Sequence, residues 1–189
     1  MTPETASPRM LKALGKGFDR AAIDRAAAVA RRTRLPVMWY FMFGAPGETE
    51  ETVRETLDFI DREIPETHLV LLVSGIRIVP GAPLEQQARA EGQLAEGQSL
   101  LRPVFYEPPI GRQRLAEIIE QQMRRRPNCI SMQDEYMPDA LLAAVSAVHR
   151  FFHSKKPLWQ YLRHLRRLIN TFGISSHALS QGKLSKGAA

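Results

Sequence analysis

Two long apolar runs, each followed by a glycine–proline turn and a helix, dominate the pattern of this sequence. Residues 37–43 form an uninterrupted apolar run, and residues 69–79 form a second, nearly unbroken one. Runs of this length are typical of strands buried on both faces of a parallel sheet that helices cover. Each run leads through a turn, at 44–47 and 80–83, towards a helix. The pattern therefore predicts two successive βα units of an α/β fold.

Helical periodicity is present between and after these two runs. Asp19 is a suitable N-cap for a helix over residues 20–34, which Leu35 and Pro36 end. The segment 50–63 places its apolar residues on one stripe and carries two glutamates in its first turn, where negative charge suits the helix dipole. The same reasoning predicts an extended, proline-rich segment over 97–111 and further helices over 84–91, 112–126, 138–153 and 157–172.

The two βα units also resemble a known family. The string FMFGAPGETEETVRETLDF, followed by GIRIVPGAPLEQQARAEG, is similar to strands five and six of the partial barrel in radical S-adenosylmethionine (SAM) enzymes. The branch that it resembles most often carries a cobalamin-binding domain ahead of the barrel. Residues 4–18 resemble the end of the family's fourth strand and the helix after it. The resemblance covers roughly residues 2–110.

The resemblance implies an α/β fold that is the carboxyl-terminal half of a partial (βα) TIM-like barrel. We expect this half-barrel over residues 1–110 and a basic α-helical extension over residues 111–173. The remaining residues, 174–189, are rich in Ser, Gly, Lys and Ala and are predicted to be a disordered tail.

The chemistry of the resembling family depends on a group that this chain is not equipped to hold. A [4Fe–4S] cluster is held by three cysteines, usually spaced CxxxCxxC, and supplies the electron that cleaves SAM to a 5′-deoxyadenosyl radical. This chain has one cysteine, Cys129, outside the resembling segment. We therefore expect the carboxyl-terminal portion of a radical SAM enzyme, truncated or split, that needs its N-terminal half as a partner. Alone it is expected to bind neither the cluster, nor SAM, nor cobalamin stably.

Six residues are candidates for binding the cofactor. Glu4 matches the family's strand-four glutamate near the ribose and amino group of SAM, and Ser7 follows it. Met42 and Gly44 match the strand-five motif beside the adenine, where the turn would let the main chain approach closely. Without the resemblance, a simple βα connection is the better explanation of the turn 44–47. Arg77 and Val79 complete the set, at the predicted end of the second strand.

Arg77 has apolar neighbours, and two interpretations of it stay open. A charge within a buried strand must be paired or must face a cavity. Arg77 could hold a carboxylate of SAM or of a substrate by two parallel hydrogen bonds, or it could form a structural ion pair with a neighbouring element. No metal site is expected, since His149 and His153 lack a third ligand.

The charge distribution suggests a second function class. The net charge is +6, and no acidic residue follows Asp139, whereas eight lysines and arginines do. A basic amphipathic helix over residues 157–172, with Trp159 near its start, favours a non-catalytic adaptor on an anionic membrane, with nucleic acid as the weaker candidate partner. One cysteine and the absence of a long apolar segment indicate a cytoplasmic protein, peripheral to a membrane if the helix binds lipid.

Overall fold

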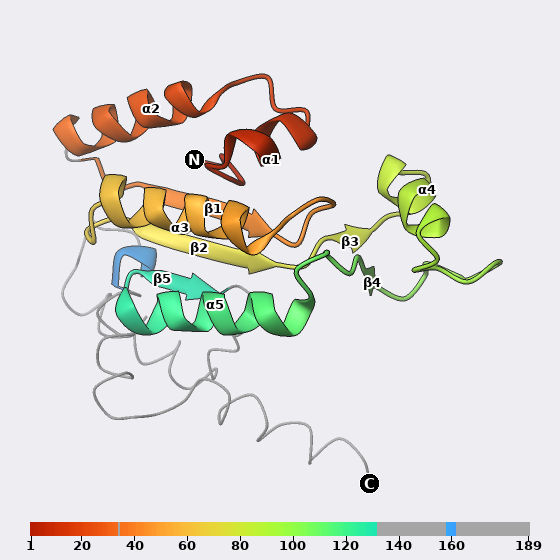
Figure 1. The fold of residues 1–189 in the computed structure, drawn as a ribbon. Coiled ribbons are helices and arrows are strands. Elements are labelled where there is room, and N and C mark those ends of the chain that lie inside the picture. Colours follow the sequence, from red (N-terminus) through yellow and green to blue (C-terminus); the bar gives the residue numbers. More distant parts are fainter. Residues whose placement is uncertain (34, 132–157, 162–189) are drawn as a thin grey trace, which may run out of the picture.

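The computed structural model describes residues 1–33, 35–131 and 158–161 (Figure 1). Helices and strands alternate along the chain, as the two βα units predict. The elements are α1 (Pro8–Ala13), α2 (Arg20–Thr33), β1 (Met38–Phe43), α3 (Glu50–Glu63), β2 (Leu69–Ser74), β3 (Arg77–Ile78), α4 (Pro83–Ala90), β4 (Val104–Phe105), α5 (Arg112–Arg125), β5 (Cys129–Ser131) and a 3-10 turn, η1 (Leu158–Tyr161).

The main sheet is parallel, and its neighbouring strands follow the order of the chain. β1 pairs with β2 over its whole length, from Met38 opposite Leu69 to Phe43 opposite Ser74. β5 pairs with the other edge of β2. The amino-terminal segment runs along the free edge of β1, where Glu4 forms a parallel bridge with Phe41. The order is thus amino-terminal segment, β1, β2, β5, and all four run in the same direction.

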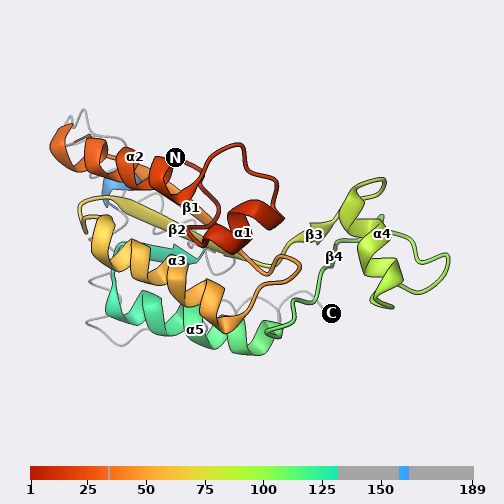
Figure 2. The ribbon, with the colours of Figure 1, turned by 45° about the horizontal axis from the view of Figure 1, so that its top comes forward.

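Three helices cover one face of this sheet (Figures 1 and 2). Helices α2, α3 and α5 bury their apolar stripes against that face, and the joint core includes Trp39, Phe41 and Phe43 of β1. These three aromatic residues are at most 1% exposed. The fold shown is a mixed α/β fold with an open, three-stranded parallel sheet.

The opposite face of the sheet is less covered than the unbroken apolar run predicts. Burial alternates along β1, and Met38, Tyr40 and Met42 are only half-buried. Among the described residues, this face packs in a small cluster around Leu69, Leu71 and Ile130, to which Trp159 of η1 adds its ring. Burial on both faces is therefore confirmed for Leu69–Leu72 of β2 and wrong for β1. Among the described helices, α2, α3 and α5 cover one side of the sheet, so the apolar run of β1 combines aromatic packing on that side with a half-buried surface on the other.

The second predicted strand is two strands in two sheets. β2 ends at Ser74, and Gly75, with a φ of +90°, redirects the chain. β3 then pairs with β4 as a short antiparallel ribbon, and α4 packs beside it around Ile78, Ala88 and Tyr106. This unit, here called the arm (residues 76–107), projects from the end of the sheet to which β1 and β2 point (Figure 2). A left-handed glycine is the physical reason that the strand does not continue to residue 79.

The α/β unit extends beyond residue 110, where the sequence placed the start of a helical extension. α5 packs against β2 through Leu115, Ile118 and Met123, and β5 joins the main sheet directly after it. The described sheet and its helices therefore continue past the boundary drawn at 110, as far as Ser131, the last described residue before a gap. The predicted helices 138–153 and 157–172 and the predicted tail 174–189 lie outside the described residues, apart from η1.

Candidate functional site

Two glycine turns meet at the carboxyl edge of the sheet, where α/β folds place their ligands. Gly44 follows β1 and has a φ of +98°. A Cβ atom at Gly44 would stand 3.2 Å from the backbone N and 3.3 Å from the Cα of Gly75. Gly75 in turn donates its N–H to the carbonyl of Phe43 at 2.8 Å. The contact fixes both turns at the same end of neighbouring strands, although the sequence predicts the second turn at residues 80–83 and the structure places it at Gly75.

A buried carboxylate closes the first of these turns. Glu48, 1% exposed, accepts hydrogen bonds from the N–H groups of Gly44 and Ala45. Burial raises the pKa of the Glu48 carboxyl above its ordinary value of 4.5, and the two N–H donors oppose that effect. Glu48 thus satisfies the main chain of the turn from within. The sequence offers one signal for it, since Glu48 stands directly before Thr49, the N-cap of α3.

Glu4 lies beside the end of β1, in an unusual conformation. It is the one non-glycine residue with a positive φ, +66°, among those described. Its N–H donates to the carbonyl of Tyr40, and its own carbonyl accepts from Met42 N–H at 2.8 Å. The carboxylate forms an ion pair with Lys16, with 2.6 Å between Oε1 and Nζ. The structure therefore brings Glu4, Met42 and Gly44 together at one end of β1.

Ser7 is not positioned to contact a ligand. It is completely buried, and its Oγ makes no hydrogen bond with a described group. The segment before it is held by Thr56 of α3, whose hydroxyl pairs with Thr5 Oγ1 at 3.0 Å and accepts from Ala6 N–H at 3.1 Å. These contacts fix the amino-terminal segment on α3 and β1, with Ser7 inside the packing.

Arg77 and Val79 are not at the end of a buried strand. Both belong to the arm, Arg77 is exposed, and Val79 is 51% exposed. Arg77 stands opposite Phe105 in the two-stranded ribbon. The premise of a charge buried in the main sheet is therefore wrong for Arg77, and no contact with a described residue favours either open interpretation of it. Gly75 is the cause, because the turn there carries both residues out of the sheet.

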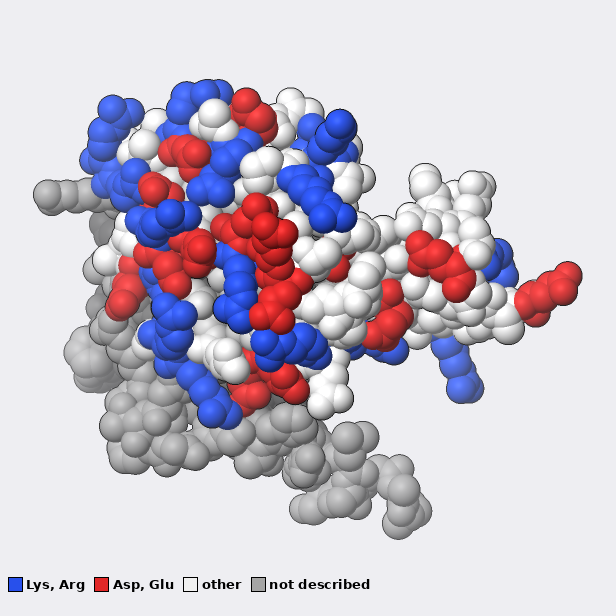
Figure 3. Space-filling model, viewed as in Figure 1, with Lys and Arg blue, Asp and Glu red and all other residues white. Residues whose placement is uncertain are grey.

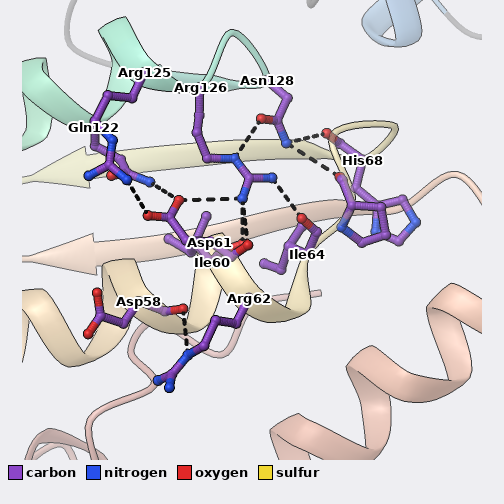
Figure 4. A network of polar contacts seen from close by, with 11 residues as sticks. Asp58, Ile60, Asp61, Arg62, Ile64, His68, Gln122, Arg125, Arg126 and Asn128 are labelled. Carbon is purple, nitrogen blue, oxygen red and sulfur yellow. Dashed lines mark hydrogen bonds and ion pairs between the residues drawn. The ribbon is translucent and has the colours of Figure 1, made fainter.

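The amino edge of the sheet holds a second polar cluster, which is saturated by its own contacts (Figure 4). Arg126 donates to the carbonyls of Ile60, Asp61 and Ile64 at 2.7–3.1 Å, so it caps the end of α3. Its Nε also donates to Asn128, whose amide donates to the carbonyl of His68 at 3.0 Å. Such a closed network joins α3, α5 and the start of β2. We interpret it as structural, because its donors and acceptors satisfy one another.

The described residues do not fit an iron–sulfur cluster. Cys129 is buried at the amino end of β5, away from the glycine turns, and no second cysteine exists in the sequence. In the described part of the chain, no three His, Cys, Asp or Glu side chains gather as a metal site would require. Nor does any described helix have the length and apolar character to cross a bilayer.

Comparison with known proteins adds no family name. No family model matches the chain, and no curated protein matches it.

Gly44 should tolerate substitution less than Gly47, which shares its positive φ but has no atom within 4 Å of the position that a Cβ would take. Gly44→Ala adds a close contact with Gly75 to the conformational strain, whereas Gly47→Ala adds the strain alone. We expect losses in the free energy of unfolding of about 2–3 kcal/mol and about 1 kcal/mol, respectively. Urea unfolding of both variants checks this, and equal losses would contradict the Gly44–Gly75 contact.

Glu48 should make stability depend on pH. Because its pKa is raised in the folded state, the folded protein holds this proton more tightly than the unfolded chain. That contribution is complete below the unfolded pKa and is lost as pH rises through the folded pKa. Glu48→Gln cannot titrate. As pH rises above the ordinary glutamate pKa of 4.5, the unfolding free energy of the wild type should therefore fall relative to this variant. Urea unfolding of both proteins across this range measures the effect. If the unfolding free energy of the wild type minus that of Glu48→Gln stays constant or rises with pH, the assignment is refuted.

Arg126 should contribute far more to stability than its neighbour Arg125. Arg126→Ala removes the side-chain donor from three carbonyls at the end of α3 and one of the donors to Asp61, so we expect a loss of about 2–4 kcal/mol. Arg125 also pairs with Asp61, but its side chain is 70% exposed, so Arg125→Ala is the matched control with a loss below about 1 kcal/mol. Arg126→Lys should recover little, since an ammonium lacks the planar fork. Similar losses for both alanine variants would reject a special role for Arg126.

Proposed function

We propose that this chain is the carboxyl-terminal part of a radical SAM-type partial barrel, and that its carboxyl edge forms part of the wall around the adenosine of SAM. The observation that carries the proposal is the strand order. The amino-terminal segment, β1 and β2 neighbour one another in chain order, run parallel and have helices on one face. That is the order expected for strands four, five and six of such a barrel, the strands that the sequence resembles.

Three residues at the end of β1 have chemistry that suits a nucleoside. The Glu4 carboxylate can accept hydrogen bonds from ribose hydroxyls or pair with the ammonium of SAM, in exchange for its present bond to Lys16. Met42 lies on the half-buried face, where its thioether can pack on an adenine ring. Gly44 takes part indirectly, because its missing side chain makes room for the main chain of Gly75 and so fixes the turn beside Met42. The other three candidates for binding the cofactor have less support. Ser7 is buried, and Arg77 and Val79 lie on the arm.

The chain by itself lacks the means to carry out radical chemistry. The cluster that would supply the radical needs three thiolates, and the chain has one, buried in β5. Catalysis therefore requires a partner that carries CxxxCxxC, and the proposed partner is the N-terminal half of the same barrel. Nothing in the described residues bears on cobalamin, which stays a prediction from the resemblance.

The adaptor function gains no supporting observation. Most of the basic segment 157–172 lies outside the described residues. Within η1, Trp159 packs on the sheet beside Met38 and Tyr40, a position that does not favour its insertion into lipid. An anionic-membrane adaptor therefore remains the second prediction.

A photoreactive SAM analogue with an azidoadenine ring tests the proposed adenosine wall. It is supplied in large excess, because the chain alone is not expected to bind SAM stably and covalent capture records even weak occupancy. We expect cross-links within residues 42–47, competed away by SAM, because this turn faces the proposed adenine. Met42→Ala should lower cross-linking roughly fivefold. Met38→Ala is the matched control, since both methionines lie half-buried on the same face of β1, at opposite ends. Cross-links confined to other segments, or equal effects of the two variants, would contradict the site.

Anaerobic incubation with iron and sulfide tests the need for a partner. We expect no stoichiometric cluster on this chain, measured as bound iron and as visible absorption. Incorporation of about four irons per chain would overturn the proposal that the thiolates come from elsewhere.

A further inference from the structure

Between α1 and α2 the surface is hollowed into an open depression of about 730 Å³. This volume is within the range of about 300–1,000 Å³ that small-molecule sites occupy. The depression lies on the helical layer rather than on the glycine turns, so it is separate from the proposed adenosine wall. Its walls come from α1, the loop 15–19 and the first turns of α2.

The depression is lined by an excess of positive charge. Lys12, Lys16, Arg20 and Arg25 line it, against one carboxylate, that of Asp19. Lys and Arg side chains also gather over α1 and α2 on the face that Figure 3 shows. Residues 1–33 contain seven lysines and arginines against three acidic residues. This local excess differs from the whole of residues 1–139, where acidic residues are slightly more numerous. An anion is therefore the ligand that the charge favours.

The four cations differ in how far they are already engaged. Arg20 is fixed, since it donates to Asp24 and to the carbonyl of Ala6 and lies 4.7 Å from the centre of the Phe59 ring. Lys16 is shared with Glu4. Lys12 and Arg25 are exposed and have no hydrogen bond or ion pair with any described residue. Two uncommitted cations and a third that can be shared suit a compact dianion such as a phosphate group.

The remaining lining is apolar and includes an aromatic ring. Pro8, Leu11 and Ala22 contribute to the walls, and Phe18 is 40% exposed. Exposed aromatic rings bind flat apolar groups by stacking or by edge contacts. We propose that the depression binds a small phosphorylated aromatic compound, with the phosphate held by Lys12, Lys16 and Arg25 and the ring packed on Phe18. A long nucleic acid is less well matched, because it needs many phosphate contacts along a track.

Binding at this depression would be coupled to Glu4 at the carboxyl edge. Glu4 and the phosphate group compete for the same Lys16 ammonium, whose Nζ is 2.6 Å from Glu4 Oε1. Removal of the Glu4 charge should therefore tighten binding of the anion, and binding of the anion should release Glu4. The site itself does not depend on the proposed radical SAM function.

Calorimetric titration with 1-naphthyl phosphate, a probe that carries no adenosine, tests the proposal. The full chain should bind it more tightly than inorganic phosphate or 1-naphthol, because each of these lacks one of the two recognised parts. The double variant Lys12→Gln/Arg25→Gln should weaken binding about tenfold. Arg9→Gln/Arg32→Gln is the matched control: it removes the same charge from exposed positions on the same helices, outside the depression, and should change affinity less than about twofold.

Two further variants examine the ring contact and the coupling. Phe18→Ser should abolish the preference for 1-naphthyl phosphate over inorganic phosphate. Glu4→Gln should tighten binding about threefold, while Glu96→Gln, at an exposed position on the arm, should leave it unchanged. Circular dichroism establishes that each variant is folded.

The proposal is overturned if 1-naphthyl phosphate does not bind, or if the two double variants weaken it equally. It is also overturned if vesicles rich in phosphatidylserine, or a single-stranded oligonucleotide, bind through Lys12 and Arg25 more tightly than the probe does. The adenosine wall is tested by different residues and a different ligand, so failure of one proposal does not imply failure of the other.

Discussion

The fixing of α3 at both of its ends is the constraint on which the rest of the structure depends. This helix connects β1 to β2, and its position therefore sets the register of the two central strands. At its start, Thr49 and Thr52 form a capping box, and Glu48 holds the turn before it. At its end, Arg126 binds the last carbonyls. In the middle of the helix, Thr56 binds the amino-terminal segment. Helix α5 docks on the first turn of α3 through the ion pair Arg114–Glu50. Hydrogen bonds from Arg114 and Arg54 lower the pKa of Glu50 to about 2.

The two edges of the sheet differ in how their polar groups are used. At the amino edge, Arg126, Asn128 and Asp61 satisfy main-chain carbonyls and one another, and the result is a closed structural network. At the carboxyl edge, Gly44 and Gly75 bring two main-chain segments into direct contact. Glu4 has a positive φ there, and its carboxylate pairs with the long side chain of Lys16. Strain and exchangeable partners are features of ligand sites more than of structural ones. This contrast supports the carboxyl edge as the functional one.

The sequence predicted the local elements well where a single physical rule decided them. The range of α3 follows from its apolar stripe and its acidic first turn, and the Asp19 cap of α2 is present as a hydrogen bond from Ala22 N–H at 2.8 Å. The errors arose where tertiary packing decided. β5, which begins shortly after a proline, is too short to give a periodic pattern. The strand predicted over 69–79 is apolar apart from Ser74, Gly75 and Arg77, and the φ of Gly75, which composition does not reveal, divides it between two sheets.

The candidate site was predictable only in part, for a related reason. Glu4, Met42 and Gly44 converge because they lie on one strand end and its parallel neighbour, a geometry that the βα pattern implies. Arg77 and Val79 do not join them. The sequence predicts both residues at the end of a strand 69–79, but that strand stops at Ser74. The depression between α1 and α2 needed three-dimensional information, because its cations come from two helices and a loop and no motif spacing joins them. Lys16 connects these two regions, because it lines the depression and its ammonium also pairs with Glu4 beside the end of β1. A ligand bound in either region would therefore change the electrostatic environment of the other.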